Sequence, residues 1–257
     1  MNLEEACLEE AKVNFANLHE ASLEVVEQSL AILKEESDLF ERSMVFQQAC
    51  ISYVMNTAAP IQDDGLRAAV LLAHYTFDML YCGWDCVLRG FYSVAMHLLR
   101  NIDQASLTAI AVTLERETAT CFWKSEPSTD GRARKVVQEA IQAGDSGFGE
   151  DWGKRAKHLR ELLHNYSHVG RVAVSPSIVI ADDSSSVSPT MGGVFIEDQC
   201  IKRGRLYSRL AFDAAINLVQ ALKSMLPTGG PLQQRYSELV DTVPSVTERW
   251  EKEMGFR

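Results

Sequence analysis

The sequence contains no long hydrophobic run, and this absence argues against one class of protein. No stretch of about 18 apolar residues occurs without a charged residue, so no transmembrane helix and no membrane partner are predicted. The amino-terminal residues MNLEEACLEEAK are acidic and lack the basic start and apolar segment of a signal peptide. The six cysteines follow no spacing typical of a disulfide framework. Together these absences predict a protein of the reducing cytoplasm.

Signatures of several enzyme classes are also missing. The chain has no Gly-x-Ser-x-Gly nucleophile turn and no glycine-rich phosphate loop of the Walker or Rossmann type. Glu-x-x-His occurs once, from Glu161 to His164, whereas a ferritin-like metal site needs a second such pair and two further glutamates. No metal and no cofactor are therefore predicted. A metal-dependent helical enzyme, with Glu161, His164 and His168 as ligands, is a third alternative only.

Apolar residues recur at helical spacing over most of the 257 residues and predict an all-α fold, a multi-helix bundle with long central helices. No internal repeat or linker divides the chain, so residues 1–257 are expected to form one domain. In it, N-terminal helices (1–60) pack on a core (63–226), and C-terminal helices (230–257) follow. The predicted helices cover residues 2–35, 37–55, 63–124 (two helices joined near Gly90), 132–143, 152–171, 202–226, 232–240 and 245–254.

One part of the core region has a different character. Residues 172–174, 178–181 and 193–196 are short and rich in β-branched side chains, and a polar DDSSSVSPTMGG segment separates the last two. Such short runs around a turn-rich segment predict a small β-hairpin insertion around residues 171–198.

The formal net charge of −10 argues against a general nucleic-acid coat, because polyphosphate is repelled on average. Residues 1–41 hold eleven acidic side chains against two lysines. The first helix therefore presents an acidic face, which is either simply solvated or binds a partner protein.

Polar stripes run along the two helices predicted over residues 63–124, which are otherwise apolar. His74 and Asp78 lie one turn apart in the first helix, so the carboxylate can orient the imidazole. His97, Arg100 and Gln104 share one side of the second helix. Burying such stripes destabilises a protein unless they are paired, so they indicate either a site or a buried network that fixes the helix register.

The helix predicted over residues 152–171 supplies a third polar face. Lys157, Glu161, His164 and His168 lie together opposite its apolar residues, with Arg160 at the margin. If the three faces meet, they form one composite pocket. That pocket would hold His74, Asp78, His97, Arg100, His164 and His168.

The order of these elements resembles that of the HEPN-like helical proteins of bacteria, in particular their uncharacterised branch. The resemblance rests on long apolar helices, on the LLRNIDQA segment that holds Arg100, and on a later helix that ends in Tyr-Ser-His before a β insertion. It covers roughly residues 65–225 in the order of elements. Catalytic members of that superfamily carry Arg, four to six residues, then His; in this chain that spacing occurs only from Arg67 to His74.

The resemblance implies a metal-independent endoribonuclease, usually a dimer, of a defence or toxin-type system. His and Arg would activate the ribose 2′-hydroxyl and stabilise the phosphorane charge. The expected roles are acid or base for His164 or His168 and phosphate contact for Arg100. RNA or a nucleotide would be the partner, and a homodimer is an open possibility. The residues expected to line the binding site are His97, Gln104, Lys157, Arg160, His74 and Asp78.

A second hypothesis comes from a different class of function. In it the chain is a catalytically silent protein–protein interaction module, which binds its partner through the acidic first helix and the loop at residues 182–193. The sequence leaves both hypotheses open.

Overall fold

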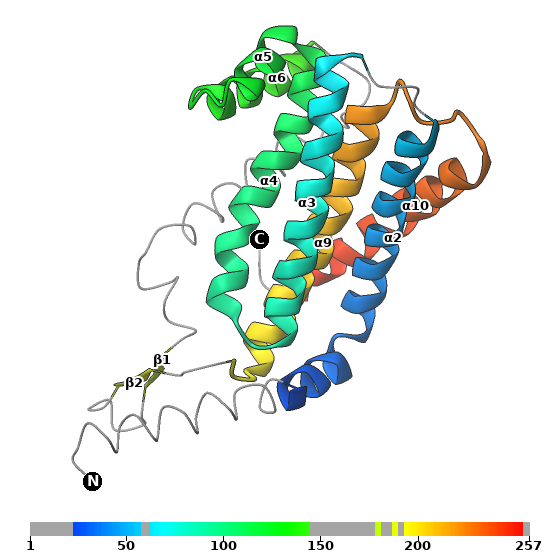
Figure 1. The fold of residues 1–257 in the computed structure, drawn as a ribbon. Coiled ribbons are helices and arrows are strands. Elements are labelled where there is room, and N and C mark those ends of the chain that lie inside the picture. The colour runs from blue at the N-terminus through cyan, green and yellow to red at the C-terminus, as the bar shows by residue number, and fades with distance from the viewer. Residues whose placement is uncertain (1–22, 58–61, 144–177, 181–186, 190–192, 254–257) are drawn as a thin grey trace.

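The fold is taken from a computed structural model, which describes residues 23–57, 62–143, 178–180, 187–189 and 193–253. The described residues are mostly helical, which confirms the predicted all-α class (Figure 1). Residues 23–32 are helical and directly precede the first long helix. The helices that follow are α2 (Lys34–Thr57), α3 (Asp64–Leu88), α4 (Tyr92–Leu114), α5 (Arg116–Trp123), α6 (Thr129–Gln142), α9 (Glu197–Leu222) and α10 (Gly230–Glu253).

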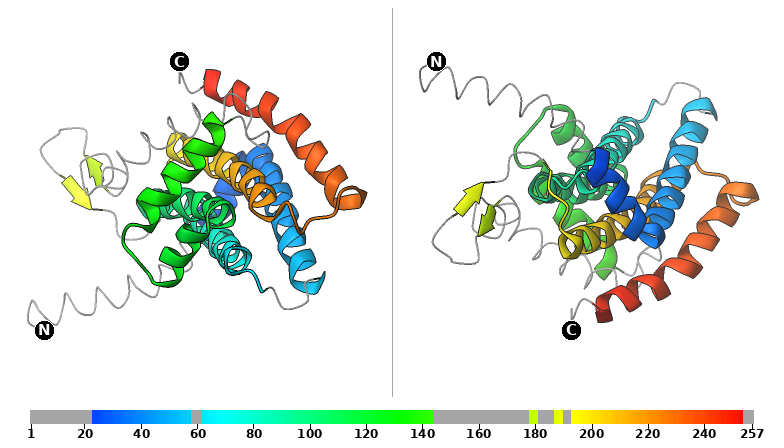
Figure 2. Two further views of the ribbon diagram at one scale, coloured as in Figure 1. Left: turned by 90° about the horizontal axis from the view of Figure 1, so that it is seen from above. Right: turned by 90° about the horizontal axis from the view of Figure 1, so that it is seen from below.

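Helix α9 is the central element of the bundle. It packs against α2, α3 and α4, and α10 lies along the outside of α2 and α9 (Figures 1 and 2). The short helices α5 and α6 pack across the end of α4. The α3–α4 pair therefore has one face on α9 and the opposite face turned away from the bundle.

The register of α9 follows its apolar spacing. Leu210, Leu218 and Leu222 lie in the buried core, as the helical period predicts. Tyr207 is completely buried, and its hydroxyl donates a hydrogen bond to the Ala95 carbonyl oxygen of α4. One aromatic side chain thus ties α9 to α4.

The α3–α4 hairpin is defined by its capping residues. The Asp63 carboxylate accepts a hydrogen bond of 2.8 Å from the Leu66 amide and caps the amino end of α3. After α3 ends, Gly90 has φ +74°, a conformation that favours glycine. The predicted join near Gly90 is therefore confirmed.

Two predicted boundaries are wrong. The second core helix stops at Leu114, because Glu115 is extended (φ −135°) and starts the separate helix α5. The two helices predicted after residue 230 are one helix, α10, which continues through Pro244. Val243 and Trp250 are buried on either side of that proline, and their burial outweighs the helix-breaking tendency of proline, about 3 kcal/mol.

The β structure is limited in the described residues to two three-residue strands. β1 (Ile178–Ile180) pairs antiparallel with β2 (Val187–Pro189), with Ile178 opposite Pro189 and Ile180 opposite Val187. Residues 193–196, predicted as a strand, are not β structure, and α9 begins directly after them. The remainder of the predicted insertion lies outside the described residues, as do most of the first predicted helix and the helix predicted over 152–171. Among the described helices, none has the length and apolar character needed to cross a membrane.

Candidate functional site

Four of the predicted site residues lie on the face of α3 and α4 that is turned away from α9. His74 and Asp78 on α3, and His97 and Arg100 on α4, all have exposed side chains. The predicted alternative of a buried network that fixes helix register is therefore wrong for these four residues, because none of them is withdrawn from water.

Four further predicted site residues cannot be placed with them. Lys157, Arg160, His164 and His168 lie outside the described residues. The meeting of three helix faces in one pocket consequently stays a prediction, as do the catalytic roles of His164 and His168.

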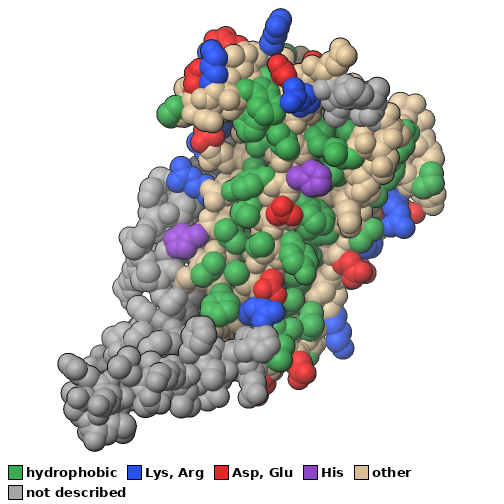
Figure 3. Space-filling model, viewed as in Figure 1, with side chains coloured by type: hydrophobic (Ala, Val, Ile, Leu, Met, Phe, Trp, Pro, Cys, Tyr) green, Lys and Arg blue, Asp and Glu red, His purple; other side chains and the backbone are tan. Residues whose placement is uncertain are grey.

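This surface, which we call the outer face of α3 and α4, also exposes large hydrophobic side chains. Leu71, Tyr75 and Tyr81 of α3 are 52%, 44% and 64% exposed, and Val94 of α4 is 49% exposed. Hydrophobic side chains gather here with a few acidic side chains and histidines among them (Figure 3). The polar stripe predicted at His74 and Asp78 lies on this same side of α3, and helical spacing alone does not tell whether the apolar side chains beside it are buried.

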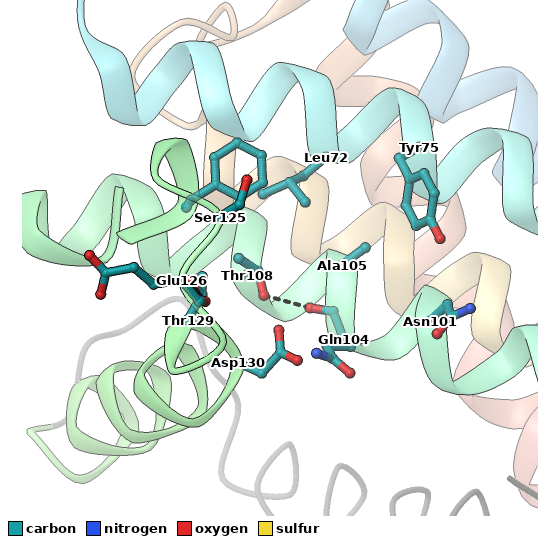
Figure 4. Close-up of a pocket in the computed structure, with 11 residues that line it drawn as sticks. Leu72, Tyr75, Asn101, Gln104, Ala105, Thr108, Ser125, Glu126, Thr129 and Asp130 are labelled. Atoms are coloured by element: carbon teal, nitrogen blue, oxygen red, sulfur yellow. Dashed lines mark hydrogen bonds between the residues drawn. The ribbon is translucent and has the colours of Figure 1, made fainter. Parts of the chain in front are cut away.

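A pocket of about 370 Å³ lies at one end of this face, where α3 and α4 meet α5 and α6 (Figure 4). Of the predicted binding residues, Gln104 lines it, one turn from Asn101 and Thr108 on α4. The remaining lining residues are Leu72, Tyr75, Ala105, Phe122, Ser125, Glu126, Thr129 and Asp130. The sequence missed those of α5–α6, because only the tertiary packing of α6 against α4 brings Asp130 near Gln104.

Carboxylate and threonine hydroxyl oxygens supply hydrogen-bond acceptors to the pocket, beside the side-chain amides of Asn101 and Gln104. Asp130 at the start of α6 points toward the part of α4 that holds Gln104 and Thr108, whereas Glu126 points away from it (Figure 4). The Thr108 hydroxyl donates to the Gln104 carbonyl oxygen at 2.8 Å, and the Thr129 hydroxyl donates to the Glu126 carbonyl oxygen at 2.6 Å. Neither hydroxyl has a second hydrogen to donate to a bound molecule.

An ion-pair cluster holds the α5–α6 side of the pocket in place. Arg132 of α6 donates from Nε to Glu115 at 2.7 Å and also contacts Glu117. The hydrogen bond from Arg132, followed by one from the Thr118 hydroxyl, lowers the pKa of the Glu115 carboxyl. The ionised carboxylate is therefore the form that the folded structure stabilises.

This lowered pKa predicts a specific pH dependence. Stability from Glu115 is present above the ordinary carboxyl pKa and is lost as the pH falls through the lowered value. We expect Glu115→Gln to destabilise the chain slightly at pH 7, because the pair is partly exposed and screened. The difference from wild type should shrink as the pH falls below the ordinary carboxyl value and vanish below the lowered one. Urea unfolding of both proteins over a pH series from 7 downward measures this, and a difference that does not shrink would contradict it.

Metal binding finds no support in the described residues, where no group of three or more His, Cys, Asp or Glu side chains is placed to hold an ion. Comparisons of the chain with family models, with curated proteins and with solved structures give no match. The functional argument therefore rests on the outer face and on the pocket.

Proposed function

We propose that this chain is a catalytically silent helical interaction module, and that a second copy of the same chain is its first partner. The observation that carries the proposal is the outer face of α3 and α4, where Leu71, Tyr75, Tyr81 and Val94 are exposed together. Large apolar side chains grouped on one face are typical of protein–protein interfaces.

The outer face follows α3 over most of its length. Exposed side chains recur from Arg67 to Cys82, a distance of about 23 Å along the helix. On α4 they end at Asn101, because residues 102–112 are buried apart from the half-buried Gln104. Helix α3 is therefore the main element of this face that a second copy can contact.

The order of side chains along α3 supports a second copy as the occupant. A two-fold axis at the level of Thr76, the middle of the helix, places an antiparallel copy so that residues equally far from Thr76 lie at the same level. His74 then meets Asp78 of the other copy, and Arg67 meets Asp85. Leu71 of one copy also lies at the same height along the helix axis as Tyr81 of the other copy. Each contact occurs twice, and the contacts of Arg67 with Asp85 join opposite charges, so the face is complementary to itself.

The charge pairing gives a sharp test. We expect wild type to sediment as a dimer, and His74→Asp to weaken the dimer about tenfold, because two repulsive carboxylate–carboxylate contacts replace two imidazole–carboxylate contacts. The double variant that carries both His74→Asp and Asp78→His swaps the two side chains and should restore the wild-type affinity of the dimer. His97→Asp, which makes the same change of charge on α4, is the matched control and should have no comparable effect. Analytical ultracentrifugation over a concentration series measures all four proteins.

Apolar substitutions provide an independent measurement. Leu71→Lys should abolish the dimer at concentrations where wild type is fully associated, whereas Met55→Lys should not, although Met55 of α2 is similarly exposed at 57%. Wild type that stays monomeric at high concentration would contradict the proposal that a second copy of the chain binds the outer face. If His74→Asp and His97→Asp weaken the dimer equally, the antiparallel pairing of the two α3 helices about Thr76 is wrong.

Engagement of RNA or a nucleotide is the second candidate. The observation that favours it is that His97 and Arg100 are exposed one turn apart on α4, accessible to a large substrate. RNA cleavage without added metal that is lost in His168→Ala, with the fold unchanged, would support a ribonuclease. Purified chain that leaves RNA intact would favour the interaction module.

A further inference from the structure

The pocket between α4 and the start of α6 has no cationic side chain among its lining residues. Two of its eleven lining residues, Glu126 and Asp130, carry carboxylates, and the Asp130 carboxylate points toward α4 (Figure 4). The amino-terminal end of α6 contributes a partial positive charge of about half a unit there, less than the full negative charge of Asp130. The local charge therefore favours a cation and disfavours phosphate.

The hydrogen-bonding groups of the pocket point to the same kind of ligand. Thr108 and Thr129 are only 4% and 8% exposed, and both hydroxyl hydrogens are used in bonds to backbone carbonyls. Their oxygens can therefore only accept from a bound molecule. An ammonium group has three donors and no acceptor, so it matches a carboxylate and two accepting hydroxyls.

The remaining walls set the shape of the ligand. Leu72, Ala105 and Phe122 are apolar, and the aromatic ring of Tyr75 lies near Asn101 at the far end of the pocket from Glu126 (Figure 4). Methylene groups fit apolar walls, and a second ammonium fits the amide oxygens and the face of an aromatic ring. A volume of about 370 Å³ lies in the range of small-molecule sites.

We propose that this pocket binds a short aliphatic diamine, of the chemical class of 1,4-diaminobutane. One ammonium contacts Asp130 and the hydroxyls of Thr108 and Thr129. The methylenes pack on Leu72 and Phe122, and the second ammonium reaches Asn101 and Gln104. The site shares Tyr75 with the outer face but does not depend on the self-association proposed above, because its charged group belongs to α6.

Calorimetric titration of the full chain with 1,4-diaminobutane tests the proposal. We expect saturable binding with a dissociation constant of about 1 mM or below. The uncharged 1,4-butanediol, which has the same length, should not bind. Asp130→Asn should weaken the diamine about tenfold or more, as expected when a charge-assisted hydrogen bond is lost. Circular dichroism and thermal unfolding establish that the variant is folded.

A matched control separates the pocket from general attraction of cations to a chain of net charge −10. Asp241→Asn removes the same charge from an exposed position on α10, away from the pocket, and should leave the affinity unchanged. Equal weakening by the two variants would reduce the effect to nonspecific electrostatics and overturn the site. Binding of adenosine monophosphate in place of the diamine, or no binding of the diamine by folded wild type, would also overturn it.

Discussion

Replacing Gly83 with alanine is expected to lower the free energy of unfolding by about 2 kcal/mol. A Cβ atom at Gly83 would lie 2.2 Å from the Tyr207 hydroxyl oxygen and 2.3 Å from a ring carbon. The Tyr207 side chain is fully buried and held by its hydrogen bond to Ala95, so it cannot move aside. Overpacking of about 3 kcal/mol therefore outweighs the gain of about 1 kcal/mol from replacing a helical glycine. Urea unfolding monitored by circular dichroism measures the change.

Gly131→Ala is the control for Gly83→Ala. Gly131 is also helical, in α6, but its added Cβ would meet nothing within 4 Å, so this substitution should stabilise the chain by about 0.5–1 kcal/mol. A smaller side chain in place of Tyr207 should relieve the overpacking, and Gly83→Ala should then have a smaller effect in the Tyr207→Leu background. If both glycine substitutions stabilise the chain, α3 and α9 do not approach as closely as the fold requires.

Local features of the fold were predictable from the sequence. Asp63 and Gly90 mark the ends of α3, because a capping carboxylate and a left-handed glycine act within one turn of the chain. The core positions of α9, such as Leu210 and Leu218, follow from the helical period alone. In both cases the information lies in neighbouring residues.

The candidate sites depend on packing, and for that reason the sequence predicted them only in part. Gln104 was predicted as a binding residue, but its neighbour in the pocket, Asp130, comes from a helix whose position against α4 no local signal reveals. Helical spacing alone did not distinguish the exposed Leu71 from the apolar residues of α3 that are buried. A hydrophobic residue indicates that its side chain is buried in a contact, but it does not indicate whether that contact is with α9 or with another molecule.

Removal of the Arg205 side chain is expected to be the most damaging of the substitutions considered. Arg205 of α9 donates to Glu36 of α2 at 3.0 Å and to Glu253 of α10 at 2.8 Å, and its guanidinium lies 5.7 Å from the ring centroid of Trp250. One side chain thus joins three helices. The Glu36 side chain is only 6% exposed, so Arg205→Ala would leave a buried carboxylate without its cation.

Breaking such a buried pair destabilises a protein by about 3–5 kcal/mol. We therefore expect Arg205→Ala to lower the free energy of unfolding by about that amount, whereas Arg42→Ala should change it by less than about 0.5 kcal/mol, because the Arg42–Asp38 pair is exposed. The double substitution Arg205→Met with Glu36→Leu should recover most of the loss, since it removes both charges and keeps the volume filled. A double variant as unstable as Arg205→Ala would assign the effect to the contacts with Glu253 and Trp250 instead of to the buried charge.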